Sequence, residues 1–173
     1  MEDCKHVLDS DMVNKVRSVN IKGNQDREVM EQLSSCTVNV ERLHNINSDN
    51  INSWLTADIL SRWKLKEISL SERSTTLTLV SLIVQTCSEL TSIKLDSSTV
   101  DDATVTIIAQ QCPKLEILEL SRYCRIVCDS LIVLSDYKLP LVELIITRIP
   151  YIQTADIARR CSHALFTHSP QQY

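Results

Sequence analysis

The sequence contains a single glycine among its 173 residues, and aromatic residues make up only 4% of it. Loops that wrap phosphate groups depend on glycine, because their backbone needs positive φ angles and approaches the ligand closely. Single-stranded nucleic acids stack on flat aromatic side chains. The scarcity of both residue types therefore argues against nucleotide chemistry and against single-strand binding.

The chain also lacks an excess of positive charge and a long apolar run. Its formal net charge is −4, and Lys and Arg are not clustered, so we expect no footprint for nucleic acid. No stretch of about 18 apolar residues is present. Residues Met1–His6 lack the basic-then-apolar layout of a signal peptide. We expect an intracellular protein, cytoplasmic or nuclear, with no membrane span.

The number of cysteines is odd, which disfavours a disulfide framework in a chain without an export signal. The seven residues are Cys4, Cys36, Cys87, Cys112, Cys124, Cys128 and Cys161. Two groupings could offer zinc ligands: Cys124 and Cys128 with Cys112, and Cys161 and His163 with His168. A structural zinc site needs four converging groups, usually from two clear pairs, so we expect packing thiols, no metal and no cofactor.

The four histidines do not suggest catalysis. They are His6, His44, His163 and His168, and none stands in a recognisable arrangement with a nucleophile. We therefore expect that the protein is not an enzyme.

What the sequence does contain is a pattern that recurs at nearly fixed distance. Its best copy is Leu115-x-x-Leu118-x-Leu120, and copies with apolar residues at the same three positions start at Val16, Leu65, Leu90 and Leu141. A weaker copy starts at Val40, where polar Asn45 takes the third position and Ile46 follows. Successive copies are therefore spaced by about 25 residues, which lies within the range of known structural repeats.

Each copy reads as a short strand buried on one side, because apolar and polar residues alternate in it. The intervals between copies show helical spacing instead, as in Val105, Ile108 and Ala109. Repeats of this length and pattern indicate an α/β leucine-rich-repeat solenoid, a right-handed horseshoe arc of about six repeats of 24–26 residues. Parallel strands are expected on the concave face and helices on the convex face.

The pattern also predicts boundaries and helix caps. We expect an N-terminal cap in residues 1–13, a repeat domain at 14–165, and a disordered or partner-bound tail at 166–173. A solenoid that stops there exposes an edge, which indicates either a truncated chain or a neighbouring chain that covers the edge. Side-chain oxygens predict helix N-caps at Asp101 or Asp102, at Asp129 or Ser130, and at Thr154.

The positions of the cysteines resemble one subclass of leucine-rich repeats. Cys87 and Cys112 stand three residues before Leu90 and Leu115, and Cys36 and Cys161 stand four residues before Val40 and Leu165. Together with the segment Asp101–Leu118, this placement is similar to the cysteine-containing subclass, best known from F-box/leucine-rich-repeat proteins and antagonist-of-mitotic-exit-network proteins. The resemblance covers roughly residues 14–165.

The resemblance implies a non-catalytic protein-interaction module, a substrate-recognition or adaptor protein of ubiquitin-ligase type. No F-box-like helix cluster with Leu-Pro at its start precedes Val16, so the ligase-docking part of this pattern is missing from the sequence. The second hypothesis is a structural scaffold subunit of a larger multiprotein assembly.

The binding surface expected of such a solenoid is its concave face. The residues between the buried strand positions are Ser18, Asn20, Arg42, His44, Glu67, Ser69, Ser92, Lys94, Ile117, Glu119, Glu143 and Ile145. One end of this set pairs Ile117 and Ile145 with Glu119 and Glu143. Apolar side chains flanked by carboxylates suit a protein partner that carries basic residues.

Overall fold

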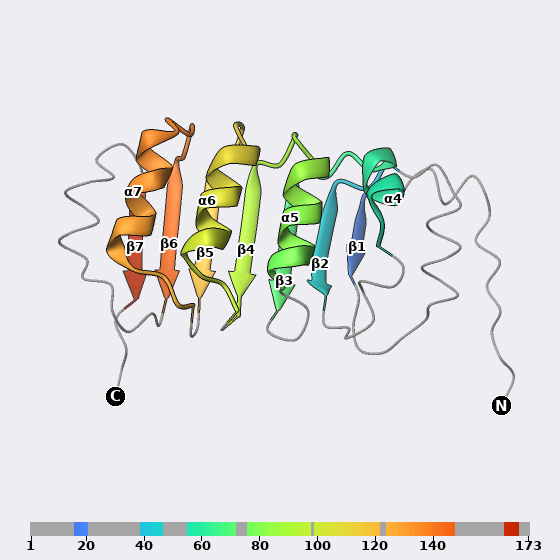
Figure 1. Ribbon diagram of the computed structural model, residues 1–173. Coiled ribbons are helices and arrows are strands. Elements are labelled where there is room, and N and C mark those ends of the chain that lie inside the picture. Colours follow the sequence, from blue (N-terminus) through green and yellow to red (C-terminus); the bar gives the residue numbers. More distant parts are fainter. Residues whose placement is uncertain are drawn as a thin grey trace, which may run out of the picture.

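The computed structural model describes residues 16–20, 39–46, 55–71, 76–97, 99–121, 124–147 and 165–169. These residues form a seven-stranded sheet, in which neighbouring strands run parallel and follow one another in the order of the chain. Figure 1 shows the strands side by side, with the described helices in one layer over one face of the sheet. The expected α/β class with a parallel sheet is thus confirmed.

Strands and helices alternate along the chain between residues 42 and 147. The strands are β1 (Ser18–Asn20), β2 (Arg42–Ile46), β3 (Glu67–Ser71), β4 (Ser92–Asp96), β5 (Ile117–Ser121), β6 (Glu143–Thr147) and β7 (Leu165–Ser169). The helices are α4 (Ala57–Arg62), α5 (Leu77–Thr86), α6 (Asp102–Gln111) and α7 (Cys128–Asp136). Each of these helices connects two neighbouring strands, which is the kind of crossover that a parallel pair requires.

The pairing register shows how regular this alternation is. Glu67 pairs with Ser92 and Ser92 with Ile117, so the step along the chain is the same from β3 to β4 as from β4 to β5. The next step, from Ile117 to its partner Glu143, is longer by a single position. Equivalent positions of successive strands therefore stand side by side, so that residues on one face of the sheet form rows.

The weakest copy of the strand motif is accommodated by an irregularity in β2. Leu43 pairs with Ile68 as the motif predicts, but the next paired residue is Ile46, which stands opposite Leu70. One extra residue on β2 therefore brings an apolar residue back into register after the polar Asn45.

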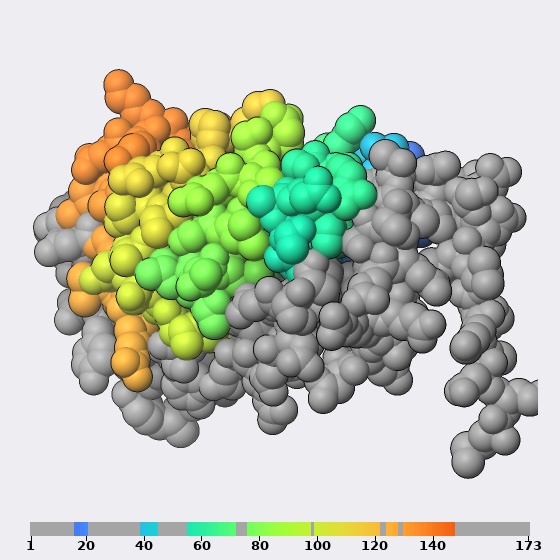
Figure 2. Space-filling view, turned by 45° about the vertical axis from the view of Figure 1, so that its right-hand side comes forward, coloured from blue at the N-terminus to red at the C-terminus, as the bar shows by residue number. Residues whose placement is uncertain are grey.

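The core lies between the sheet and the helix layer. The three apolar motif positions that lead into and through β3, β4 and β5 are at most 1% exposed. Helices α5 and α6 cover them with side chains at three- and four-residue spacing. These are Leu79, Val80, Ile83, Val84, Val105, Ile108 and Ala109. In the last motif copy Leu144 and Ile146 are buried, whereas Leu141 is only partly buried. Figure 2 shows α4 to α7 as a continuous layer of helices.

Side-chain caps begin three of the described helices. Thr56 and Thr76 cap α4 and α5 by accepting hydrogen bonds from backbone N–H groups of the first turn. The Asp101 carboxylate accepts from the backbone N–H of Thr104 at 2.9 Å, and the N–H of Asp101 donates to the Thr104 hydroxyl at 3.4 Å. Of the two caps predicted for α6, Asp101 is therefore the one that forms, in a reciprocal capping box.

The start of α7 differs from the prediction that Asp129 or Ser130 caps it. The helix begins at Cys128, and its N-cap residue Val127 makes no side-chain cap bond. The predicted residues fall inside the first turn, where the Ser130 hydroxyl donates to the Val127 carbonyl at 2.6 Å. The backbone N–H of Val127 donates instead to the carboxylate of Asp102, at 3.1 Å.

The expected end of the repeat domain also needs correction. Strand β7 pairs with β6 over its whole length, with Phe166 opposite Leu144, so the sheet continues past residue 165 to Ser169. Residues 166–169, half of the segment that we expected to be a tail, are thus part of the sheet. The expected cap at 1–13, the predicted helix start at Thr154 and residues 170–173 lie outside the described residues.

Candidate interaction surface

The predicted binding residues lie on the outer sheet face, which is the face opposite the helices. They alternate with the buried strand positions and form two rows across the strands. The first row consists of Ser18, Arg42, Glu67, Ser92, Ile117 and Glu143. The second consists of Asn20 and His44, then, beyond the irregularity of β2, of Ser69, Lys94, Glu119 and Ile145.

The exposure of these side chains varies along the rows. Ser18, Asn20, Arg42 and Lys94 are exposed, and the other eight are half-buried, because neighbours on adjacent strands shield them. The structure therefore brings all twelve predicted residues to one face. It does so in an order that places the longest basic side chains in β2 and β4 and the isoleucines in β5 and β6.

Within the described strands, two ion pairs join neighbouring strands on the outer sheet face. Lys94 Nζ lies 2.6 Å from Glu119 Oε1, and His44 Nε2 lies 3.8 Å from Glu67 Oε1. The second pair attracts only while the histidine is protonated. All four side chains keep some contact with water, so each pair stabilises the fold by about 0–1 kcal/mol. Their main effect is to orient the charged groups on this face.

The two strands β5 and β6 combine apolar and acidic side chains. Ile117 stands opposite Glu143, and Glu119 stands opposite Ile145, so that the two kinds alternate diagonally. Glu143 has no ion-pair partner among the described residues. A partner that covers the isoleucines gains by removing apolar surface from water, and a basic group on it is attracted by the carboxylates.

A third row extends this face and was missed by the sequence prediction. It consists of Ser71, Asp96, Ser121 and Thr147, at the last residue of each strand from β3 to β6. Continuing the alternation by one more position would have found it. The row is interrupted at Ser121, which is buried: its side chain is only 7% exposed. Its carbonyl accepts a hydrogen bond from the Cys124 thiol at 3.3 Å.

Cys87, Cys112 and Cys124 are free and buried, as expected of packing residues. Burial raises the pKa of Cys87 and of Cys112 to about 12 and that of Cys124 to about 11, the last despite a backbone hydrogen bond at Ser97 that acts in the opposite direction. Thiolates, which are the nucleophilic and metal-binding form, are thus suppressed at neutral pH. Cys4, Cys36 and Cys161 lie outside the described residues.

The described part of the chain offers no group of three or more His, Cys, Asp or Glu side chains that could hold a metal ion. Each helix of this part is too short or too polar to span a lipid bilayer. No protein-family model matches the chain, and no curated protein is significantly similar to it. The resemblance to cysteine-containing leucine-rich repeats therefore rests on the sequence motif alone.

Proposed function

We propose that the chain is a non-catalytic protein-interaction module, built as a leucine-rich-repeat solenoid of the cysteine-containing type. The nearly constant step along the chain between paired strands from β1 to β6 supports this architecture, as do the helices on one side of the sheet. So do Cys87 and Cys112, which end α5 and α6 and are buried just before the next strand. In such solenoids the outward strand residues form an extended binding surface.

One observation carries the functional part of the proposal: the pairing of Ile117 with Glu143 and of Glu119 with Ile145. Two half-buried isoleucines and two carboxylates in this register suit a protein partner with a basic residue next to apolar ones. The role that the family resemblance implies is substrate recognition, or an adaptor function, of ubiquitin-ligase type.

Affinity capture from native extract tests the proposed surface. The tagged full chain is compared with the charge reversals Glu119→Lys and Glu143→Lys on the outer sheet face. Asp58→Lys is the matched control, because Asp58 lies in α4, in the helix layer, and its side chain is 80% exposed. We expect one set of proteins to be captured by wild type and control but reduced about tenfold or more by the reversals. Equal capture by all four proteins contradicts the proposal.

A structural scaffold subunit is the alternative function. It is favoured by the position of β7 as the last strand of the described sheet, because an edge strand can pair with a strand of a neighbouring chain. The same capture experiment separates the two functions. Ubiquitin-ligase components in the captured set support the recognition role, whereas stoichiometric co-purification with one large assembly supports the scaffold.

A further inference from the structure

The loop between α7 and β6 differs from the corresponding loops earlier in the chain. Tyr137 is the C-cap residue of α7, and the C-cap residues of α4, α5 and α6 are Trp63, Cys87 and Cys112. Those three are at most 5% exposed, whereas Tyr137 is 46% exposed. A large aromatic side chain is thus turned to the surface at a position that is otherwise part of the core.

Val142, at the other end of the same loop, is a second residue whose character differs from that of its counterparts in the earlier loops. It stands directly before β6, where Lys66, Thr91 and Glu116 stand directly before β3, β4 and β5. Its three counterparts are polar, as is usual at the surface, whereas Val142 is apolar and still 55% exposed. Its backbone is held in place, because its N–H donates to the Glu116 carbonyl at 2.8 Å. The exposed valine therefore belongs to an ordered part of the chain.

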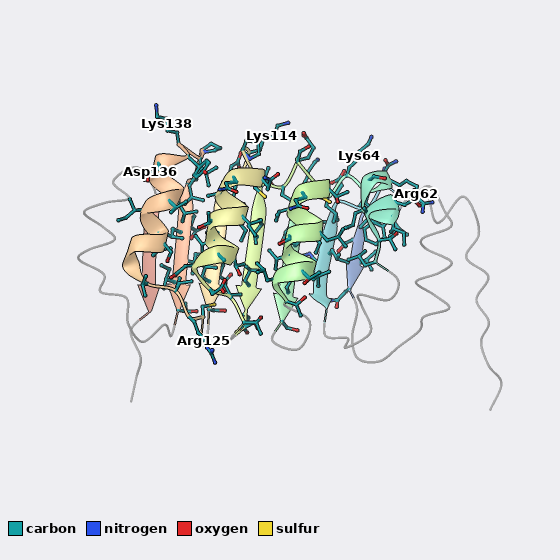
Figure 3. All side chains as sticks on the ribbon, viewed as in Figure 1. Arg62, Lys64, Lys114, Arg125, Asp136 and Lys138 are labelled. Carbon is teal, nitrogen blue, oxygen red and sulfur yellow. The ribbon has the colours of Figure 1, made fainter. Side chains whose placement is uncertain are left out.

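The loop is also longer and conformationally unusual. The step along the chain from Ile117 to its partner Glu143 exceeds the steps between β3, β4 and β5 by a single position. Lys138 has φ of 50°, in the left-handed region that a residue with a Cβ adopts only at an energetic cost. Figure 3 shows Lys138 and Asp136 at the rim of the sheet where the strands begin.

Exposed apolar surface gathers at this loop. Of the large apolar residues that the described segments expose, Tyr137 and Val142 both belong to it, and the others are Leu77 and Val127. Between them, Leu139 and Leu141 are only partly buried. We call Tyr137, Leu139, Leu141 and Val142 the rim patch. Val142 precedes Glu143 directly, so the rim patch adjoins the outer sheet face.

The charges around the rim patch indicate what could cover it. Glu116, Asp136 and Glu143 have no ion-pair partner among the described residues. Lys138 is the single basic residue of the loop. A second copy of the chain would bring these carboxylates against their own equivalents, which costs free energy. A partner with basic residues is instead attracted.

We propose that the rim patch docks a segment of a partner protein in which a basic residue is flanked by apolar residues. This inference rests on the proposed function: the segment continues from β5 and β6 on the outer sheet face, over the rim, to Tyr137. Tyr137 is the anchor, because aromatic side chains with a polar tip are enriched among the residues that dominate interface energies.

Selection of displayed random 16-residue peptides on the immobilised full chain provides the probe. The selected peptides are then titrated by fluorescence anisotropy against purified variants. Tyr137→Ser and Val142→Ser test the rim patch, and Ile145→Ser and Glu119→Gln test the outer sheet face. Leu77→Ser is the matched control, since Leu77 is 40% exposed at the start of α5. We expect rim and face variants to weaken binding about tenfold, and the control to stay within about twofold.

The outcomes separate the two proposals. Sensitivity to the face variants alone overturns the rim patch and keeps the proposed function. Sensitivity to the rim variants alone overturns the outer sheet face as the binding surface, and with it the continuous segment that we infer. Peptides that tolerate all four substitutions, or a selection without enrichment of basic and apolar residues, contradict both.

Two further measurements exclude other coverings of the rim patch. We expect the melting temperatures of Tyr137→Ser and Val142→Ser to stay within about 2 °C of wild type, because exposed side chains contribute little to stability. A larger drop shows that the chain itself covers the patch and overturns the inference. Sedimentation of a wild-type dimer that Tyr137→Ser dissociates shows a second copy on the patch, and it overturns the inference equally.

Discussion

The carboxylate of Asp102, in the first turn of α6, accepts a hydrogen bond from the backbone N–H of Val127, which precedes α7, at 3.1 Å. Beside this contact, the N–H of Arg125 donates to the Val100 carbonyl at 2.7 Å, and Asp101 and Arg125 form a parallel bridge. The chain segments that lead into the two helices are therefore tied to each other. One helix start positions the next across a distance of 25 residues in sequence.

We expect Asp102→Ala to lower the free energy of unfolding by about 0.5–1.5 kcal/mol, since it removes a hydrogen bond to a charged acceptor from the start of α7. Asp102→Asn is the matched control, because its amide oxygen can still accept from Val127. It should lose less than half as much. Urea denaturation of the three proteins measures the difference. Equal losses in both variants would mean that the helix dipole, and not this hydrogen bond, accounts for the effect of Asp102.

The parts of the fold that could be predicted from the sequence are those whose pattern lies within one short segment of the chain. The strands could be predicted because Leu115, Leu118 and Leu120 report their own burial through alternation, whatever their neighbours do. The start of α7 could not be predicted, because the backbone N–H of Val127 donates to Asp102, which lies one strand and one helix earlier in the chain. Rules for caps consider only the first turn, and they led to Asp129 or Ser130. The continuation of the sheet to Ser169 was missed because the apolar motif is incomplete there: the partners of Leu144 and Ile146 are Phe166 and the polar His168.

The candidate site was predictable to the same degree. Alternation alone placed Lys94 and Glu119 on one face, but their contact at 2.6 Å depends on the register between β4 and β5. The exposure of Tyr137 was not predictable either. Cys87 and Cys112 are buried at the ends of their helices. Tyr137 stands at the same position of α7, and only the course of the longer loop after it shows that its side chain is exposed.

The buried thiols should make stability depend on pH. Burial raises the pKa of Cys87 and of Cys112 from 9.0 to about 12. Between about pH 9 and 12 the unfolded chain releases these protons and the folded chain keeps them, so the free energy of unfolding falls as pH rises. The stabilising contribution is complete below pH 9. Each thiol should add a slope of about −1.4 kcal/mol per pH unit within this window.

Comparison of wild type with Cys112→Ala isolates this slope from other groups that titrate at high pH. Denaturation by urea at about pH 8, 9 and 10.5 gives the free energy of unfolding of each protein. The variant is less stable at pH 8, because it leaves a small cavity, but its loss with rising pH should be shallower. Parallel curves for the two proteins would show that the Cys112 thiol titrates normally in the folded state.

The ion pair between Lys94 and Glu119 should contribute little to stability despite its short distance. Lys94 keeps 46% of its side-chain surface exposed, so water screens the attraction. A double-mutant cycle of Lys94→Met and Glu119→Gln should give a coupling of about 0–1 kcal/mol that shrinks in about 1 M salt. By contrast, Leu118→Ala, which removes a fully buried side chain from β5 next to Glu119, should lower the free energy of unfolding by about 2–5 kcal/mol. A coupling that salt leaves unchanged would contradict this.

Replacing Lys138 by glycine should stabilise the protein. Its φ of 50° places a Cβ where the left-handed backbone crowds it, just after the C-cap of α7, a position that glycine favours. Lys138→Gly should raise the free energy of unfolding by about 0.5–1 kcal/mol, part of the relief being offset by the greater freedom of glycine in the unfolded chain. Lys138→Ala removes the same charge but keeps the Cβ, so it should bring no gain. If both variants gain equally in urea denaturation, the cause is the lost positive charge and not the backbone.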